Sequence, residues 1–357
     1  MKKSLLLVGA FLTVAAMAQA KEVVPAPVVV TEAPVQIVEK EVIVYRDRAP
    51  VGFRPNGYVD LQYRWYGETE NKENGENPWA GKTNYSRIQL QGKINMTENQ
   101  TLEYRVRDYN SVTSKEGTGK NGADTRLRYF YNHGNLGDSN VNLTSRIHYR
   151  DRNDTTPNRQ ELEYQARFNF ADYMFNNDYV KTTDFVLAPK YGYQWNSNDD
   201  DYDNQLGVDL YTMHEFPLGF SFEFNVYNTQ HFYGQKQGFD GGNKEKDKNF
   251  TVDVEAYIYN TQNLYTNGDV TVDFNFEGGY DPYTWSQYKQ FGKYENQKQD
   301  YSLYAQPTVQ FNYQATPFVK LYVAAGAEYR NWKITAKSDA KDWRWQPLVF
   351  AGFRASF

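Results

Sequence analysis

The sequence predicts an all-β protein, a transmembrane antiparallel up-and-down β-barrel of about 14 strands, with about 16 strands as the alternative. Apolar and polar residues alternate in many segments, a two-residue period that is typical of strands. Aromatic residues are abundant in a chain that is polar overall, and the last segment alternates up to a terminal phenylalanine. Together these observations indicate strands with one face toward lipid and the other toward water.

The composition supports a barrel over a helical membrane protein. Aromatic residues make up 17% of the chain, with 31 Tyr and 22 Phe, yet the mean hydropathy is −0.81. In a membrane barrel only alternate strand residues meet lipid, so the average remains polar while the outward set is apolar. The chain has no cysteine, which excludes disulfide and thiol chemistry.

The first residues predict an exported protein. Lys2 and Lys3 precede an apolar run from Leu5 to Met17, and residues 18–20 read Ala-Gln-Ala, a small-residue cleavage site. We therefore expect a signal peptide over residues 1–20. Its removal would change the net charge from 39 − 44 = −5 to 37 − 44 = −7. This mild acidity argues against a nucleic-acid partner.

Residues 21–53 differ in composition from the rest of the chain. Prolines at positions 25, 27, 34 and 50 interrupt valine-rich segments, which predicts an extended periplasmic linker before a barrel over residues 54–357. A disordered segment, or one that docks to the cell wall, another subunit or the barrel interior, is the alternative.

Alternation predicts fourteen strands from Tyr58 onward. Their expected ranges are 58–66, 84–94, 101–108, 124–131, 141–149, 160–170, 183–195, 205–214, 220–230, 250–259, 270–280, 301–313, 319–332 and 343–357. Most are near the 9 to 11 residues or so that a tilted strand needs to cross a membrane. Compact connections alternate with longer polar ones such as 67–83, 231–249 and 281–300, as short periplasmic turns alternate with external loops.

The last predicted strand carries an aromatic pattern on its outward face. Its outward aromatic residues are Trp343, Trp345, Phe353 and Phe357. Such a terminal strand resembles the assembly signal of outer-membrane barrels, so outer-membrane lipid and the barrel-insertion machinery are the expected partners. The final strand of a soluble sandwich is the alternative.

Prolines 189, 307 and 347 interrupt predicted strands and are expected to mark bulges. Leu348 and Phe350, on the nominal inner face, could reflect such a register slip.

Charges on the predicted inward positions segregate by sign. The first six strands place basic residues inward, namely Arg64, Arg87, Lys93, Arg105, Arg107, Arg126, Arg128, Arg146 and Arg167. Strands eight to eleven place acidic residues inward, namely Asp209, Glu223, Asp253, Glu255, Asp273 and Glu277. Because strands three to five lie across a fourteen-stranded ring from strands ten to twelve, opposed walls would create a transverse field. Alternatively, these charges only solvate the lumen and pair with neighbours such as Glu103 and Glu161.

No catalytic, metal or cofactor motif is evident. The four histidines (133, 148, 214 and 231) lack ligand spacing, and His148 is expected to be a solvated wall residue. The acidic run at 199, 201 and 203 imitates a calcium loop, but Asn204 replaces its turn glycine and Leu210 its bidentate glutamate. We therefore predict neither an enzyme nor a cofactor. A barrel hydrolase remains an alternative.

Two alternatives concern other kinds of barrel. Inward tyrosines at 211, 227, 257, 304 and 322 could form a stacking surface in a saccharide-specific channel. A structural barrel whose external loops mediate adhesion is the other.

Several segments resemble one known family, the fusobacterial major outer-membrane porins (FomA family). They are R-P-N-G-Y-V-D-L-Q-Y-R-W-Y-G-E (54–68), E-G-G-Y-D (277–281), F-V-K-L-Y-V-A-A-G-A-E-Y-R-N (318–331), W-R-W-Q-P (343–347), K-E-V-V-P-A-P (21–27) and V-I-V-Y-R-D-R (42–48). The resemblance implies a trimeric, voltage-sensitive general-diffusion porin of a Gram-negative-type outer membrane that can also act as an adhesin. Residues 111–123 and 234–248 look like variable loops.

Overall fold

The computed structural model describes residues 52–70, 84–112, 122–153, 158–196, 201–239, 244–288, 299–334 and 340–357. The predicted signal peptide and nearly all of the predicted linker lie outside these ranges, so both remain predictions.

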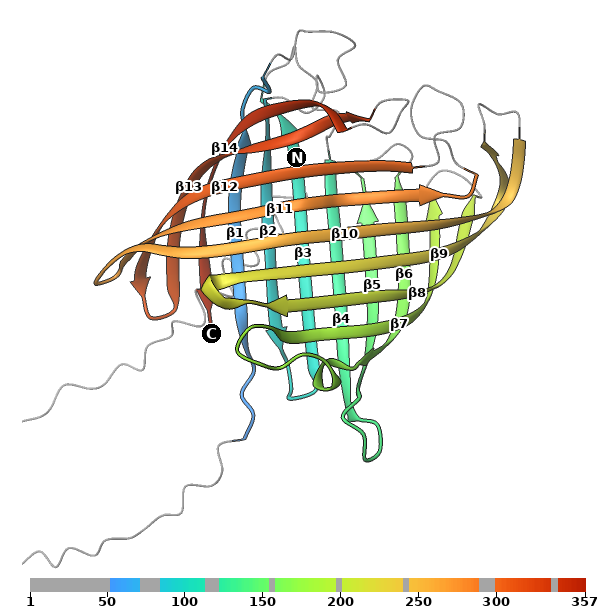
Figure 1. Cartoon of the computed structure of the whole chain (residues 1–357), viewed down its shortest axis with the longest axis horizontal. Helices are drawn as coiled ribbons and strands as arrows, with labels where there is room; N and C mark the ends of the chain where they lie inside the picture. Colours follow the sequence, from blue (N-terminus) through green and yellow to red (C-terminus); the bar gives the residue numbers. More distant parts are fainter. Residues whose placement is uncertain are drawn as a thin grey trace, which may run out of the picture. The chain divides into compact units, whose positions relative to one another are not determined.

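The described chain forms one closed antiparallel barrel of fourteen strands, which confirms the predicted fold class (Figure 1). Each strand pairs with its neighbours in sequence, and β14 pairs with β1 to close the ring. The strands are β1 (Asn56–Tyr66), β2 (Tyr85–Asn95), β3 (Gln100–Ser111), β4 (Gly122–Asn135), β5 (Asn142–Arg152), β6 (Arg159–Asn169), β7 (Lys181–Asn196), β8 (Tyr202–Glu215), β9 (Phe220–Phe239), β10 (Lys244–Asn267), β11 (Val270–Ser286), β12 (Gln299–Thr316), β13 (Val319–Ile334) and β14 (Ala340–Ser356).

Short turns join the strands at one end of the barrel, as the sequence predicts. Two of them contain a single 3₁₀ turn each, η2 (Ala171–Tyr173) and η3 (Pro217–Gly219). The turn from β10 to β11 has only two residues, and its first, Gly268, has φ 56°, which a two-residue hairpin turn requires. Among the described residues, no helix is long and apolar enough to cross a membrane.

The predicted long loop 231–249 is wrong. β9 continues to Phe239 and β10 begins at Lys244, so the two strands pair inside the predicted loop, for example through Lys244 and Phe239, with a register shift between Lys246 and Lys248. Both faces of this hairpin carry polar residues, so the alternation that marks a strand disappears although backbone pairing continues. β11 likewise extends to Ser286, beyond its predicted end.

The prediction of bulges at the three prolines is also wrong. The register of β7 with β8 continues through Pro189, that of β11 with β12 through Pro307, and that of β13 with β14 through Pro347. Each proline therefore costs at most its own ladder hydrogen bond without shifting the register. Consequently Leu348 and Phe350 truly lie on the inner face. They are 0% and 7% exposed and pack with Tyr66, Tyr322 and Ala324.

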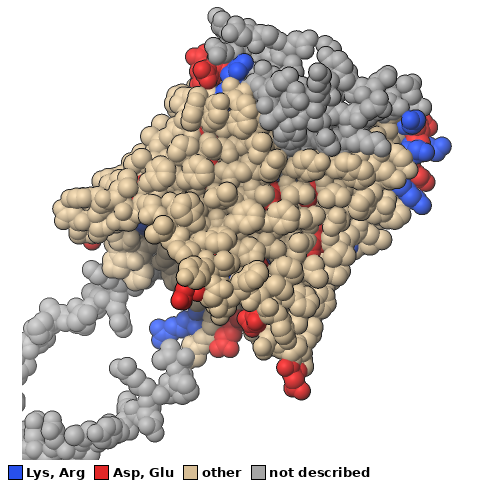
Figure 2. All heavy atoms as spheres, in the orientation of Figure 1, with Lys and Arg blue, Asp and Glu red and all other residues tan. Residues whose placement is uncertain are grey.

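Burial in the barrel is inverted relative to a soluble domain. Exposed apolar residues occupy alternate positions along the strands, for example Tyr63, Ile88, Ile147 and Val323. Many of the most buried side chains are polar, including Gln165 and Gln346, both 0% exposed. Figure 2 shows few charged atoms across the face of the wall that is in view, with Lys, Arg, Asp and Glu gathered mainly toward its two ends. This distribution is the one expected of a barrel whose outer wall faces lipid.

Candidate functional site: the inner wall

Contacts between strands that are not adjacent identify the inner face. Gln165 of β6 donates a hydrogen bond to the hydroxyl of Tyr211 of β8 at 3.0 Å, passing over β7. The hydroxyl of Tyr322 of β13 donates to Asp60 of β1 at 2.8 Å, passing over β14. Side chains can meet across an intervening strand only on the concave side of a sheet. The strand register then assigns the remaining strand residues to the inner or the outer face.

The structure places all the predicted basic residues on this inner face. They occupy alternate positions of β1 to β6, in register with one another or with inner-face partners: Arg64, Arg87, Lys93, Arg105, Arg107, Arg126, Arg128, Arg146 and Arg167. Several are directly opposite a like charge: Arg64 faces Arg87, and Arg126 lies between Arg105 and Arg150. Like charges in such pairs are destabilising unless the surroundings compensate.

Two carboxylates organise this basic wall. Asp124, 3% exposed, accepts two hydrogen bonds from Arg150 at 2.9 and 3.0 Å and lies 3.4 Å from Arg105. Glu163 accepts a hydrogen bond from Arg146 at 2.6 Å. These pairs fix some of the guanidinium groups against the wall while a net positive charge remains.

Several basic residues of the same face lie outside the predicted set. They are Arg150 and Arg152 on β5, Arg159 on β6, Lys190 on β7 and Arg330 on β13. The predicted strand 141–149 ends too early to include Arg150 and Arg152. The predicted strand 160–170 begins too late to include Arg159. Continuing the two-residue alternation by three residues at the end of the first strand and by one residue at the start of the second would have found them.

The predicted acidic residues share the inner face on the other half of the ring. Asp209, Glu223, Asp253, Glu255, Asp273 and Glu277 lie on β8 to β11 at positions that the register connects to Asp209 and Tyr227. Most of them accept a hydrogen bond from a neutral side chain. Asp253 accepts one from Thr284, and Asp273 one from Asn312 at 2.7 Å.

Tyrosines are the main partners of these carboxylates. Tyr211 donates to Asp209 at 3.2 Å, Tyr227 to Glu255 at 2.8 Å and Tyr259 to Glu223 at 2.9 Å. Tyr304 donates to Glu277. A tyrosine hydroxyl orients a carboxylate without cancelling its charge, whereas an arginine would neutralise it. The acidic wall is thus ordered and still negative.

The same contacts leave little ring surface for saccharide stacking. Tyr304 and Tyr322 are 6% and 8% exposed. The guanidinium carbon of Arg330 lies 4.5 Å from the ring centre of Tyr304, and that of Arg167 lies 4.2 Å from the ring centre of Tyr211. Cations or neighbouring rings already occupy the faces that a sugar would need.

The two walls also adjoin each other, at β6 to β8. Lys190 of β7 forms an ion pair with Asp209 at 2.8 Å, and both side chains are almost fully buried. The guanidinium groups of Arg146 and Arg167 lie over the ring of Tyr211. Tyr211 therefore marks the boundary at which the basic wall ends and the acidic wall begins.

The histidines do not form a site among the described residues. His148 is 8% exposed, with Nδ1 3.9 Å from Glu163, so the expectation of a solvated wall residue is wrong. His231 lies 2.7 Å from Asp203, and Asp201 accepts a hydrogen bond from Gln237. Asp199 lies outside the described residues. Within the described ranges, no group of three or more His, Cys, Asp or Glu could hold a metal ion.

Three of the predicted assembly residues, Trp343, Trp345 and Phe353, lie along the outer face of β14, and Phe357 follows directly after its last residue. Trp345 and Phe357 are 45% and 52% exposed, and Trp343 stacks on Tyr329 with ring centres 5.0 Å apart. Phe353 pairs with Leu61 and Leu321, two other outward residues. This apolar surface would meet lipid at the seam of the barrel.

Replacing Tyr227 with phenylalanine should destabilise the barrel by about 1–2 kcal/mol, because Glu255 loses a hydrogen-bond donor on the inner wall. Urea unfolding of the refolded protein measures the change. Tyr63→Phe is the matched control, because Tyr63 is 50% exposed on the outer face, and we expect a change within about 0.5 kcal/mol. Equal effects of the two substitutions would contradict a structural role for the tyrosine–carboxylate pairs.

Comparisons with known proteins return matches to solved structures at low sequence identity. No family model matches the chain. No curated protein matches it in sequence. Among solved structures, a bacterial polysaccharide outer membrane secretin is 10% identical, with TM-score 0.39, over 84% of this chain and 98% of that one. The outer membrane channel DcaP of Acinetobacter baumannii is 12% identical, with TM-score 0.37, over 85% and 96%. OmpF of Salmonella typhi, solved with daunomycin, is 11% identical, with TM-score 0.36, over 85% and 98%.

Proposed function

We propose that this chain is an outer-membrane porin. The barrel spans the outer membrane of a Gram-negative-type bacterium and encloses a water-filled channel for passive diffusion of ions and small hydrophilic solutes. The apolar outer wall supports a membrane location, because exposed Tyr, Ile, Leu and Val side chains recur at alternate positions around the ring. The signal peptide at residues 1–20 directs export, and the insertion machinery recognises the last strand.

The observation that carries the channel function is the charge pattern of the inner wall. Arginines cover β2 to β6, and carboxylates cover β8 to β11, where neutral donors hold most of them and Lys190 pairs with Asp209. A barrel whose role was only structural would not need an inner wall with charges separated by sign. Separated charges favour cations along one side of a wet lumen and anions along the other.

The resemblance to the fusobacterial porins supports finer proposals. We propose that the chain belongs to that family and assembles as a homotrimer with voltage-dependent conductance. Surface adhesion through the external connections is a further role that the same resemblance supports. We propose no catalytic activity.

Purified, refolded protein should form stepwise single-channel currents in a planar lipid bilayer. The conductance should rise in proportion to the conductivity of the bath, because ions in a wide wet lumen move much as they do in bulk solution. Heat-denatured protein at the same detergent concentration is the control. A correctly closed barrel without any conductance would contradict the proposed function and favour an adhesive or structural role.

A further inference from the structure

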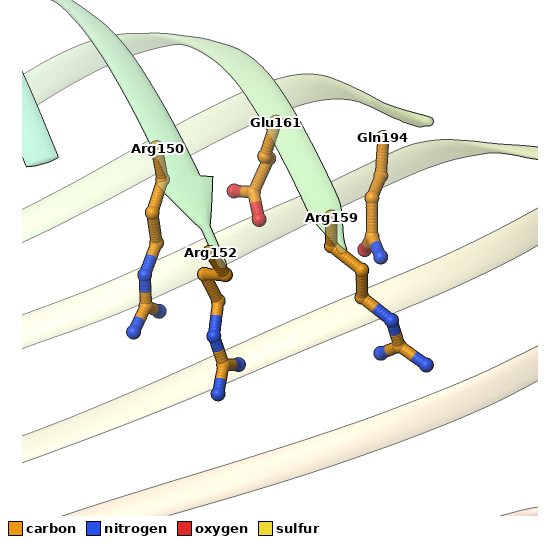
Figure 3. Close-up of a pocket in the computed structure, with 5 residues that line it drawn as sticks. All are labelled: Arg150, Arg152, Arg159, Glu161 and Gln194. Atoms are coloured by element: carbon orange, nitrogen blue, oxygen red, sulfur yellow. The ribbon is translucent and has the colours of Figure 1, made fainter. Parts of the chain in front are cut away.

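A small pocket on the inner wall brings three arginines together where β5 ends and β6 begins. Its lining residues are Arg150 and Arg152 of β5, Arg159 and Glu161 of β6, and Gln194 of β7 (Figure 3). The three guanidinium groups extend in the same general direction, while the side chains of Glu161 and Gln194 lie alongside them. We call this cluster the arginine pocket.

The strand register forces like charges together in this region. Arg152 lies directly opposite Arg159, and Arg126 lies directly opposite both Arg105 and Arg150. Residues in such cross-strand pairs have Cβ atoms about 5 Å apart, and like charges at that distance repel. Nothing in backbone pairing requires arginine at these positions.

The carboxylates nearby compensate only part of this charge. Two cross-strand rows run through this region from β3 to β8. They contain three acids, Asp124, Glu161 and Asp203, and six arginines, Arg105, Arg107, Arg126, Arg150, Arg152 and Arg159, which gives 6 − 3 = +3. Asp124 already pairs with Arg150 and Arg105, at 2.9 and 3.4 Å. Arg159 has no ion-pair partner within the described ranges.

We infer that the arginine pocket binds a compact oxyanion with two or more negative charges, such as a polyphosphate or phosphate ester. Guanidinium groups present paired N–H donors that match phosphate oxygens, and two opposed arginines can bridge one such anion. The amide of Gln194 offers a neutral donor on the same wall. This role rests on the proposed channel function, because a solute reaches the pocket through the lumen.

Glu161 limits how tightly the arginine pocket binds an anion. Its carboxylate lies directly opposite Arg150 and lines the same pocket, so it repels a bound anion. Binding is thereby weak enough for release, as transport requires. Glu161→Gln should therefore tighten anion binding, and arginine substitutions should weaken it.

Titration calorimetry of the refolded full chain in detergent, with pyrophosphate as the probe, tests the site. We expect saturable binding that Arg159→Gln weakens about tenfold, since one charge-assisted interaction is lost. Glu161→Gln should tighten binding severalfold. Lys181→Gln is the matched control: it removes one positive charge at the opposite end of the wall, where Lys181 is exposed beside Glu215, and should leave binding unchanged. Unheated gel migration verifies that each variant folds.

Acetate and citrate distinguish anion classes in the same experiment. Citrate binding supports a site for multivalent oxyanions in general, whereas acetate binding as tight as that of pyrophosphate would overturn the selectivity for multiple charges. Absence of saturable pyrophosphate binding in a conducting barrel would overturn the pocket but not the porin. Saturable, Arg159-dependent binding in a barrel that does not conduct would support the pocket as an anion site and refute the channel. Equal affinities in Arg159→Gln and Lys181→Gln would also overturn the pocket.

Discussion

Removing residues 354–357 is expected to prevent formation of a closed, heat-modifiable barrel. These residues pair with β1 through Ser356 and Tyr58, Ala355 and Val59, and Arg354 and Asp60. Backbone hydrogen bonds of 3.0 Å run in both directions between Gly57 and Phe357. Their loss leaves the ends of β1 and β13 with unpaired backbone groups at the seam, which lipid cannot satisfy.

Gel migration of unheated and boiled protein measures this effect. The full chain should migrate differently in the two states, and the truncated chain should not. Phe357→Ala separates backbone pairing from recognition of the aromatic side chain. Because that side chain is 52% exposed while its backbone closes the seam, refolding in detergent should survive the substitution, whereas assembly in cells should slow. Normal heat-modifiability of the truncated chain would show that these residues are not needed for closure.

Neutralising the two walls should shift ion selectivity in opposite directions. Arg126→Gln with Arg128→Gln should raise the preference for cations, and Glu223→Gln with Glu255→Gln should raise the preference for anions. The glutamine replacements on the acidic wall retain an oxygen that Tyr259 and Tyr227 can still hydrogen-bond. One charge about 10 Å from a permeating ion, at an effective dielectric constant of about 40, contributes about 0.8 kcal/mol, or about fourfold in local ion concentration.

Reversal potentials across a salt gradient in a planar bilayer measure the shift. It should shrink at high salt, because the Debye length falls from about 10 Å at 0.1 M to about 3 Å at 1 M. Lys181→Gln with Glu215→Gln removes an exposed ion pair at the barrel end and should leave selectivity unchanged. Changes of the same sign from both walls, independent of salt, would mean that these residues act through packing or local width rather than charge.

The alternation of residues is enough to predict the barrel and the face of most charged residues. A strand has a two-residue period, so once a segment is identified, the side of each residue follows from its position. Alternation assigns Arg105, Arg126 and Glu255 to the inner face, and the structure places them there. The even number of strands and the short turns at one end also follow from local sequence.

Prediction from sequence fails where local pattern and backbone pairing disagree. β9 and β10 remain paired beyond the apolar band, where both faces are polar and the period vanishes. Leu348 and Phe350 suggest a register slip because apolar residues are not expected inside, yet they pack against Tyr66 and Tyr322 in an inner apolar cluster. Pro347 keeps its place in the ladder with β13.

The sequence by itself thus determined the fold class, the strand count and the sorting of side chains, because these depend on period and turn residues. Only the tertiary structure decided which side chains meet. Tyr322 reaches Asp60, 262 residues away, because β14 closes the ring between their strands. Arg152 opposes Arg159 because the register of β5 with β6 aligns them beyond their predicted ends. Such contacts depend on register and closure, which arise from backbone hydrogen bonds between distant segments rather than from residue order within any one of them.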